Sequence, residues 1–226
     1  CWVVTALSKA LDFRNGLSES RSAVPGIYGS IRSLEAGGAC LKWLQKNVLS
    51  SEHADFETID REAAKRPAAE DGLFFFPETG KDGSGLMTRS CFSGISLSHD
   101  RYHLARAVME GVSFQLKWML EEFPSAPSPD GILLSGGASK SGFWSQITSD
   151  ILGLPVRVPD APDLPCFGAA MLAAYGAGET ASLNETVKRY RPEETVVYPS
   201  GKKEAYQKAY QLYQNCAAHA GSSGGR

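Results

Sequence analysis

The stretch from Gly131 to Gly153, GILLSGGASKSGFWSQITSDILG, constrains the fold of this chain more than any other. It begins with a short apolar run, Ile132 to Leu134, which is typical of a buried strand, and two glycines then break that run. Apolar residues recur at helical spacing after the glycines, Ser139 or Ser141 can cap the helix, and Gly153 predicts its end. A strand that runs through paired glycines into a helix brings bare backbone close to a ligand, which suits a flat base or a phosphate.

Two well-known glycine loops do not match this stretch. The phosphate loop G-x-x-x-x-G-K-[ST] fails because Ser139 precedes Lys140 where that motif needs glycine, and the spacing from Gly136 is too short. The dinucleotide pattern G-x-G-x-x-G fails because Gly136, Gly137 and Gly142 stand at other offsets. Two interpretations remain: a nucleotide-binding turn, or an ordinary strand-to-helix turn whose glycines serve only packing.

Four separated blocks of sequence resemble one family. The central stretch and the following DLPCFGAAMLAAYGAGE resemble the C-terminal domain of the FGGY carbohydrate kinases, most closely the xylulokinase-like members. FSGISLSHDRYHLARAVMEGVSF at Phe92 to Phe114 and AGGACLKWL at Ala36 to Leu44 agree with it, in the family's order. The resemblance runs from Cys1 to about Gly178, and four blocks are far more specific than one glycine pair.

The resemblance implies an α/β fold of the ribonuclease-H-like, actin-like ATPase class, with a mixed sheet flanked by helices. The order of the predicted elements favours the same α/β class. We expect residues 1–226 to form the C-terminal nucleotide-binding domain of a longer kinase, with 1–200 as the core and 201–226 as a helix and tail. Because the chain starts directly as a strand at Cys1, without methionine, an N-terminal lobe is expected upstream.

The resemblance also assigns residues to a nucleotide site. Gly136, Gly137 and Ala138 would lie against the adenine and ribose of ATP, and Ser141 stands where some relatives have asparagine. A hydroxyl can still form hydrogen bonds there, but it lacks the two-sided recognition of adenine that an amide offers, so we expect weaker affinity or base selectivity.

A second strand, glycine and helix passage begins at Ala36. The resemblance brings Gly38, and Lys42 one helical turn later, close to the nucleotide. The alternative for Lys42 is a solvated helix lysine whose stem covers apolar surface.

For the intact protein the resemblance implies ATP- and Mg²⁺-dependent phosphorylation of a sugar hydroxyl, on a pentulose such as D-xylulose or a related ketose or polyol. Such a transfer needs positioning, charge neutralisation and a carboxylate that accepts the hydroxyl proton. In the family the catalytic aspartate and most sugar contacts belong to the upstream lobe, so no catalytic residue is assigned here and the chain alone is expected to be inactive. The PETGKDGSG loop at 77–85 replaces the G-E-R-x-P loop usual in the family, which leaves its sugar contacts open.

Two other classes of function remain open at this point. One is a non-catalytic regulator of the same fold that binds nucleotide or sugar, which the departures at Ser141 and at 77–85 allow. The other is an assembly ATPase of the actin-like class, which shares the fold but not these sequence blocks. Fold alone does not choose among the three.

Composition excludes several further classes of function. A net charge of −2 and a pI near 6.1 give no electrostatic case for nucleic acid or an anionic membrane. No apolar run approaches a membrane span and no signal peptide is present, so we predict a cytoplasmic protein. The five cysteines contain no C-x-x-C pair, which argues against a disulfide framework or a zinc site. The oligomeric state stays open, a homodimer included.

Further elements follow from local patterns. Leu104, Val108, Val112 and Met119 predict one apolar face of a long helix. Glu110 lies off that face, one turn after Arg106, and the two form an i, i+4 ion pair worth a few tenths of a kcal/mol. The alternative, which the resemblance implies, is that Glu110 organises the cleft between the two domains. His99 and His103 could hold a metal, but no third ligand is visible, so capping or surface roles are favoured and no metal site is predicted. We further expect strands at 2–10, 26–34, 73–76, 92–97 and 156–158, and a short strand near 12–14 followed by an Asn15-Gly16 turn. Helices are expected at 36–48, at 99–123 with Ser98 as the cap, and at 202–219. Residues 185–199 are expected to form a linker and edge structure.

Three helices carry more specific expectations. Glu57, Asp60 and Arg61 lie in a charged segment, 50–72, that predicts an exposed helix. The small residues of 166–177 predict a helix packed tightly behind the nucleotide loop. Asp163 either orients that loop through backbone N–H groups or is an ordinary exposed loop aspartate. The tyrosines of the last helix predict a docking face: Tyr206, Tyr210 and Tyr213.

Overall fold

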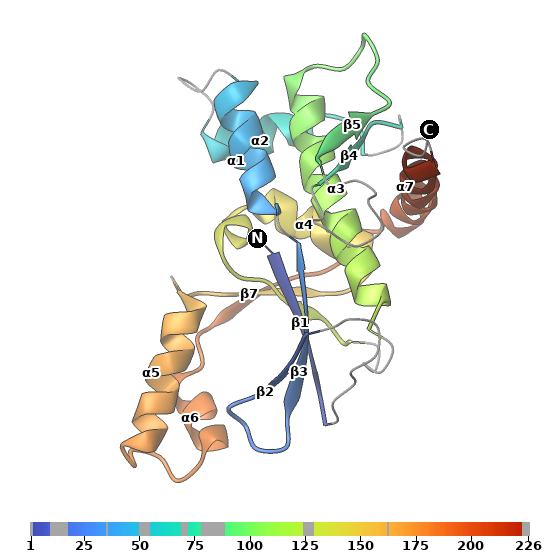
Figure 1. Cartoon of the computed structure of the whole chain (residues 1–226). Coiled ribbons are helices and arrows are strands. Elements are labelled where there is room, and N and C mark those ends of the chain that lie inside the picture. Colours follow the sequence, from blue (N-terminus) through green and yellow to red (C-terminus); the bar gives the residue numbers. More distant parts are fainter. Residues whose placement is uncertain are drawn as a thin grey trace.

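A computed structural model describes residues 2–9, 18–34, 36–49, 55–68, 72–77, 89–123, 129–161 and 163–222. Figure 1 shows a helical part, which holds α1 to α4 and α7, and a part built on strands below it, with α5 and α6 beside each other at one end. None of the helices in these ranges combines the length and apolar character needed to cross a membrane.

In the first sheet, β3 (Tyr28–Leu34) lies between two strands that both pair with it antiparallel, β1 (Trp2–Ser8) and β2 (Ser18–Arg21). Trp2 pairs with Leu34, and Ser8 pairs with Tyr28. The predicted strands at 2–10 and 26–34 are confirmed, whereas β2 was not predicted. The expected piece near 12–14 and the Asn15-Gly16 turn lie outside the described residues.

Two helices and a short antiparallel pair of strands follow the first sheet. They are α1 (Gly38–Asn47), α2 (Phe56–Ala64) and the antiparallel strands β4 (Phe74–Phe76) and β5 (Cys91–Ser93). The predictions of α1, of a helix within 50–72 and of a buried strand at 73–76 are confirmed. The predicted strand at 92–97 is shorter than expected. The charged helix α2 is amphipathic rather than wholly exposed, because two of its residues are fully buried, Ile59 and Ala63.

Helix α3 (Arg101–Glu121) forms the centre of the molecule (Figure 1). It contacts α1, α2, α4, β1 and β4, and every residue from Ala105 to Phe114 is buried. The crossing over β4 is close at Gly111, where an added Cβ would lie 1.9 Å from the carbonyl oxygen of Phe75. Only glycine permits this approach.

A second, mixed sheet carries the central glycine stretch. Strand β6 (Ile132–Leu133) runs parallel to β7 (Val156–Pro159), which pairs antiparallel with β8 (Glu194–Val197). A 3₁₀ turn, η2 (Gly137–Lys140), leads from β6 into α4 (Gly142–Leu152). Strand β6 is less buried than its apolar sequence predicts, because it lies at the edge of this sheet and Leu133 is 58% exposed.

Helices α5 (Leu164–Gly176) and α6 (Leu183–Tyr190) pack against each other. The prediction that the small residues of 166–177 pack tightly behind the nucleotide loop is wrong: no residue of α5 is buried, and no described atom lies near an added Cβ at Gly168 or Gly176. Alanine favours the helix without burial, so small residues alone do not indicate a close contact. The linker expected at 185–199 contains α6 and the edge strand β8.

Helix α7 (Lys203–Ser222) closes the helical part. Its tyrosines are buried, and Tyr213 stacks on Phe76 with ring centroids 4.5 Å apart. Phe114 of α3 contacts all three tyrosine rings, Tyr206, Tyr210 and Tyr213. The predicted docking face is therefore confirmed, and these aromatic contacts fix α7 against α3 and β4.

The Gly111 contact gives a first prediction. Alanine at an unconstrained helix site stabilises by up to about 1 kcal/mol relative to glycine, but Gly111→Ala should destabilise by about 3 kcal/mol or more because its methyl group overlaps the Phe75 carbonyl. Gly168→Ala in α5 is the matched control, since its methyl group meets open space, and it should be neutral or stabilising. Urea unfolding measures both, and equal effects at the two sites would contradict the close crossing.

Candidate functional site

The backbone of the glycine turn is open to solvent. Gly136 and Gly137 are exposed, and no described atom lies within 4 Å of a Cβ added to either residue. Gly136 has φ +89° and ψ −160°, a conformation that is essentially restricted to glycine. The two glycines thus present bare main chain to whatever binds above them.

The residues that follow the open backbone are anchored. Ala138 is only 8% exposed and belongs to the hydrophobic core. The Ser139 hydroxyl donates to the carbonyl oxygen of Gly136 at 2.8 Å. Ser141 is the N-cap of α4, because its Oγ accepts from the backbone N–H of Trp144 at 2.9 Å, so of the two predicted caps Ser141 is confirmed.

Trp144, whose backbone N–H is bound by Ser141, is itself fixed by its indole side chain. The side chain is 3% exposed, and its Nε1 donates to the carbonyl oxygen of Met109 in α3 at 3.1 Å. Gly153, with φ +67°, ends α4 as predicted. The glycine turn is therefore held between a strand and a helix that is itself fixed to the centre of the molecule.

A cavity of about 710 Å³ lies beside the turn, at the carboxyl ends of the parallel strands β6 and β7. Ligands of open α/β sheets commonly bind at this edge. Lys140 borders the cavity together with Asp160 and Asp163. Asp163 accepts from the Cys166 backbone N–H at 2.9 Å, a hydrogen bond that lowers the pKa of Asp163. It therefore caps α5, and the structure records no hydrogen bond from Asp163 to the glycine turn.

The start of α1 is a helix N-terminus without a side-chain cap. Gly38 is its first residue, Gly37 provides no side-chain cap, and the first turn has no acidic residue. Such a helix N-terminus suits an anion. Lys42 is exposed one turn later, and Cys40 belongs to the same hydrophobic core as Ala138. The core thus joins α1 to the glycine turn.

Asp60 is a polar residue at this site that sequence reasoning missed. It was assigned to an exposed charged face, but it is half-buried on α2, and α2 contacts α4. Burial raises the pKa of the Asp60 carboxyl, and a hydrogen bond from the Ser141 side chain opposes that shift. The signal was its place beside the buried pair Ile59 and Ala63, at the edge of the apolar stripe of α2.

The family model for the C-terminal domain of the FGGY family of carbohydrate kinases matches residues 3–177. This match covers well over half of the sequence. The chain belongs to the FGGY family.

Relatives of this FGGY domain include two curated kinases. The L-xylulose/3-keto-L-gulonate kinase of Escherichia coli is 33% identical over 168 residues, which are 72% of this chain and 33% of that protein. The probable L-xylulose kinase of Pasteurella multocida is 30% identical over 175 residues, 77% of this chain and 35% of that protein. The chain thus spans about a third of the length of these relatives.

The solved structures agree with the family assignment. The xylulose kinase of Rhodospirillum rubrum superposes with a TM-score of 0.84 and 27% identity, over 96% of this chain and 45% of that one. This likeness confirms the predicted α/β fold of the actin-like ATPase class.

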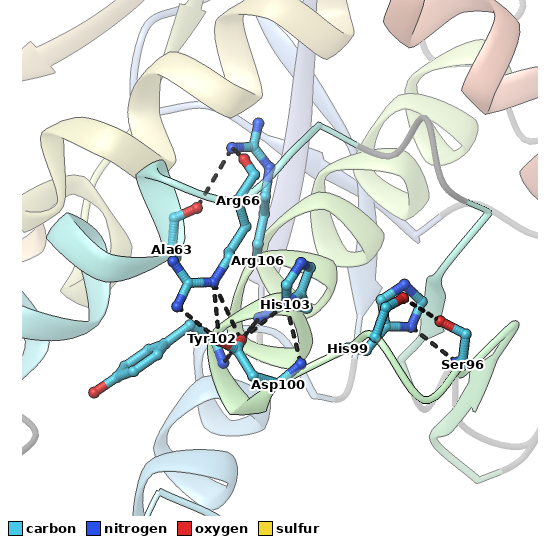
Figure 2. A network of polar contacts seen from close by, with 9 residues as sticks. Ala63, Arg66, Ser96, His99, Asp100, Tyr102, His103 and Arg106 are labelled. Atoms are coloured by element: carbon cyan, nitrogen blue, oxygen red, sulfur yellow. Dashed lines mark hydrogen bonds and ion pairs between the residues drawn. The ribbon is translucent and has the colours of Figure 1, made fainter.

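An exposed clamp joins the end of α2 to the start of α3 in this FGGY domain. Figure 2 shows Arg66 reaching the Asp100 carboxylate, with its Nη2 2.7 Å from Oδ2. Asp100 also accepts from the backbone N–H groups of Tyr102 and His103, so it is the N-cap of α3. The prediction that Ser98 caps this helix is wrong, because α3 begins at Arg101 and Asp100 is the residue that precedes its first free donors.

The two predicted capping histidines lie near this clamp. The Nδ1 atom of His103 accepts from the Asp100 backbone N–H at 3.1 Å and completes a capping box, and Nδ1 of His99 accepts from the N–H of Ser96 at 3.0 Å (Figure 2). Both histidines therefore bond backbone groups, as the favoured interpretation predicted. Within the described ranges, no three His, Cys, Asp or Glu side chains are grouped so as to hold a metal ion.

A buried network lies next to the clamp. Arg106 and Glu110 form the predicted i, i+4 ion pair, with Nε 2.7 Å from Oε1, but their side chains are only 4% and 3% exposed. Tyr206 donates to Glu110, and Arg106 donates to the carbonyl oxygens of Ala63, at 3.5 Å, and Arg66, at 2.7 Å, at the end of α2. The predicted pair is therefore confirmed, but the sequence did not indicate that tertiary contacts bury it. A role for Glu110 in the cleft between the two domains stays a prediction.

The Asp100 clamp gives a pH-dependent prediction. The Arg66 side chain, followed by the backbone donors, holds the pKa of Asp100 well below its ordinary value. A depressed folded pKa stabilises the fold fully above the unfolded pKa of about 3.9, and this contribution is lost progressively as the pH falls from there toward the folded pKa. Asp100→Asn keeps a capping oxygen, so it should cost at most about 1 kcal/mol at neutral pH, and the cost should be smaller near pH 3.

Urea unfolding at several pH values between neutral and about 3 measures this difference. Asp130→Asn, at an exposed aspartate outside the clamp, is the matched control and should show no such trend. A constant difference between wild type and Asp100→Asn across that range would contradict the clamp.

Proposed function

We propose that the intact protein transfers the γ-phosphoryl group of ATP to a hydroxyl of a small sugar, and that this chain supplies the adenine-nucleotide side of the cleft. The observation that carries the proposal is the open main chain at Gly136 and Gly137, in a domain of the FGGY carbohydrate kinase family. The remainder of the intact protein supplies the upstream lobe, with the catalytic carboxylate and most sugar contacts.

The residues of this chain act by positioning. The backbone at Gly136 and Gly137 lies flat against the nucleotide, with Ala138 behind it as a fixed core residue. Ser141 stands at the edge of the base, and Gly38 and Lys42 face the nucleotide from α1. Anchored groups of this kind hold the reactants in a productive orientation without ordering cost at the moment of reaction.

The proposed acceptor is a pentulose such as D-xylulose, or a related ketose or polyol. Support comes from the relatives, whose names specify xylulose or L-xylulose kinases. The loop at 77–85, which departs from the usual family sequence, lies mostly outside the described residues. The acceptor is therefore assigned from the relatives and not from contacts in this chain.

Mg²⁺ completes the proposed chemistry. When bound, it neutralises the charge on the transferring phosphoryl group. The described residues contain no group of side chains suited to ligate it, so we assign its coordination to the nucleotide phosphates and to the rest of the intact protein.

A coupled assay of ADP release tests the proposed function. The full-length protein, with ATP, Mg²⁺ and a panel of ketoses and polyols, should release ADP in proportion to at least one pentulose, whereas this 226-residue chain alone should show no sugar-dependent release. Binding of nucleotide or sugar without turnover would favour a regulator instead, and ATP-dependent polymers without turnover would favour an assembly ATPase.

A single methyl group tests the role of the open backbone. Gly137 has no positive φ and no close neighbour among the described atoms, so Gly137→Ala should leave the free energy of unfolding nearly unchanged. The methyl group would nevertheless stand between the backbone and the nucleotide, and we expect ATP affinity to fall about tenfold or more, which corresponds to about 1.4 kcal/mol.

Two further glycines serve as controls for this measurement. Gly176→Ala, in α5, should not change stability, because its methyl group meets open space among the described atoms. It should not change ATP affinity either, because Gly176 is not part of the glycine turn. Gly136→Ala should lose stability by about 1–2 kcal/mol, because its positive φ strains any side chain. Unchanged ATP binding by folded Gly137→Ala would remove the backbone from the proposed site.

A further inference from the structure

A buried network of three side chains joins the last helix to the centre of the molecule. Arg106 and Glu110 of α3 are 4% and 3% exposed, and Tyr206 of α7 is 1% exposed. The Tyr206 hydroxyl accepts from Nη2 of Arg106 at 3.0 Å and donates to Oε1 of Glu110 at 2.8 Å. It therefore uses its single proton and one lone pair inside the network. The family model ends at residue 177, so α7 lies beyond the part of the chain that it matches.

The guanidinium of Arg106 also faces the first turn of α4. Its Cζ atom lies over the ring of Phe143, 5.3 Å from the ring centroid, which is within the range of a cation–π contact. A planar guanidinium forms hydrogen bonds at its edge and stacks with its face, so Tyr206 and Phe143 meet two different sides of one group. Phe143 itself packs against the hydrophobic core. A displacement of the guanidinium therefore reaches both α7 and α4.

The first turn of α4 is held by α3 from two sides. Trp144 donates to the carbonyl oxygen of Met109 at 3.1 Å, and Phe143 lies against Arg106, about one turn earlier in α3. Successive side chains of a helix point about 100° apart, so the two contacts restrain the turn in different directions. Because the glycine turn directly precedes α4, a shift at Phe143 moves the backbone at Gly137.

We propose that Tyr206 is a positioning residue for the nucleotide, which acts on the glycine turn through Arg106 and Phe143. This inference rests on the proposed function, in which a nucleotide lies against Gly137. Without the Tyr206 hydroxyl, Nη2 of Arg106 loses this acceptor. A buried donor without its acceptor costs free energy, so the guanidinium moves toward another acceptor and away from its place over Phe143. The last helix thus sets the geometry of the nucleotide site.

A second tyrosine of the same helix provides the matched control. Tyr210 is 5% exposed, and its hydroxyl donates to Oε2 of Glu121, at the end of α3, at 2.8 Å. Its hydroxyl thus has the same chemistry and similar burial, but it bonds Glu121 and not Arg106. If the two hydroxyls serve only to dock α7, removing either one lowers stability and the two variants change ATP affinity alike.

Tyr206→Phe tests the proposal in the full-length protein. The Kd of a non-hydrolysable ATP analogue and the KM for ATP should rise about fivefold to tenfold, while the KM for the sugar stays unchanged, because the sugar contacts belong to the rest of the intact protein. Tyr210→Phe should leave all three constants nearly unchanged. Thermal melting checks that both variants are folded and measures the stability that each one loses.

Phe143→Leu provides an independent arm, because it removes the ring and keeps an apolar side chain. It should weaken binding of the ATP analogue by a similar factor, and in its background Tyr206→Phe should have no further effect on affinity. Additive effects of the two substitutions would overturn the route through Phe143. If Tyr206→Phe proves unfolded, Phe143→Leu alone decides, and wild-type affinity in that variant overturns the inference.

The outcomes also separate this inference from the proposed function. A folded Tyr206→Phe that binds the ATP analogue as wild type does, or an equal loss of affinity in Tyr210→Phe, overturns the role of Tyr206 and leaves the kinase proposal standing. Wild type that binds no nucleotide overturns both.

Discussion

The close crossing of α3 over β4 at Gly111 is the contact on which the rest of the packing depends. It brings a helix with a long buried stretch into the centre, and that stretch includes the ion pair of Arg106 and Glu110. A buried pair is tolerated only when its remaining hydrogen-bonding groups are satisfied. Here the end of α2 and Tyr206 of α7 satisfy them, so two elements distant in sequence are positioned by one network.

Helix α3 also fixes the position of the exposed glycine turn. Trp144 bonds the Met109 carbonyl, Ser141 caps the helix that carries Trp144, and Ala138 is fixed in the core. Between the strand and the cap, the backbone of the two glycines stays open. A surface that is ordered before binding loses little conformational freedom when a ligand arrives, which is why a turn of small residues can serve as a rigid platform.

Local signals in the sequence predicted much of this arrangement. The sequence predicted the strand, the paired glycines of the turn, the serine cap and the helix end at Gly153, because each of these features depends on neighbouring residues. The failures share a different cause: the exposure of α5, the burial of Arg106 and Glu110, and the position of Asp60 are set by elements far away in the chain. An i, i+4 pair looks the same in sequence whether it faces water or a core tyrosine. The site residues themselves stay predictions until nucleotide binding is measured.

The capping role of Ser141 changes what the asparagine of some relatives means for this chain. An amide offers both a donor and an acceptor to a base, so it can form more hydrogen bonds than a hydroxyl. The Ser141 hydroxyl already accepts the Trp144 backbone N–H at 2.9 Å, so part of its hydrogen-bonding capacity serves α4. The residue that would meet the base therefore also holds the start of the helix, and replacing it would change the anchoring of the glycine turn together with the hydrogen bonds offered to a ligand.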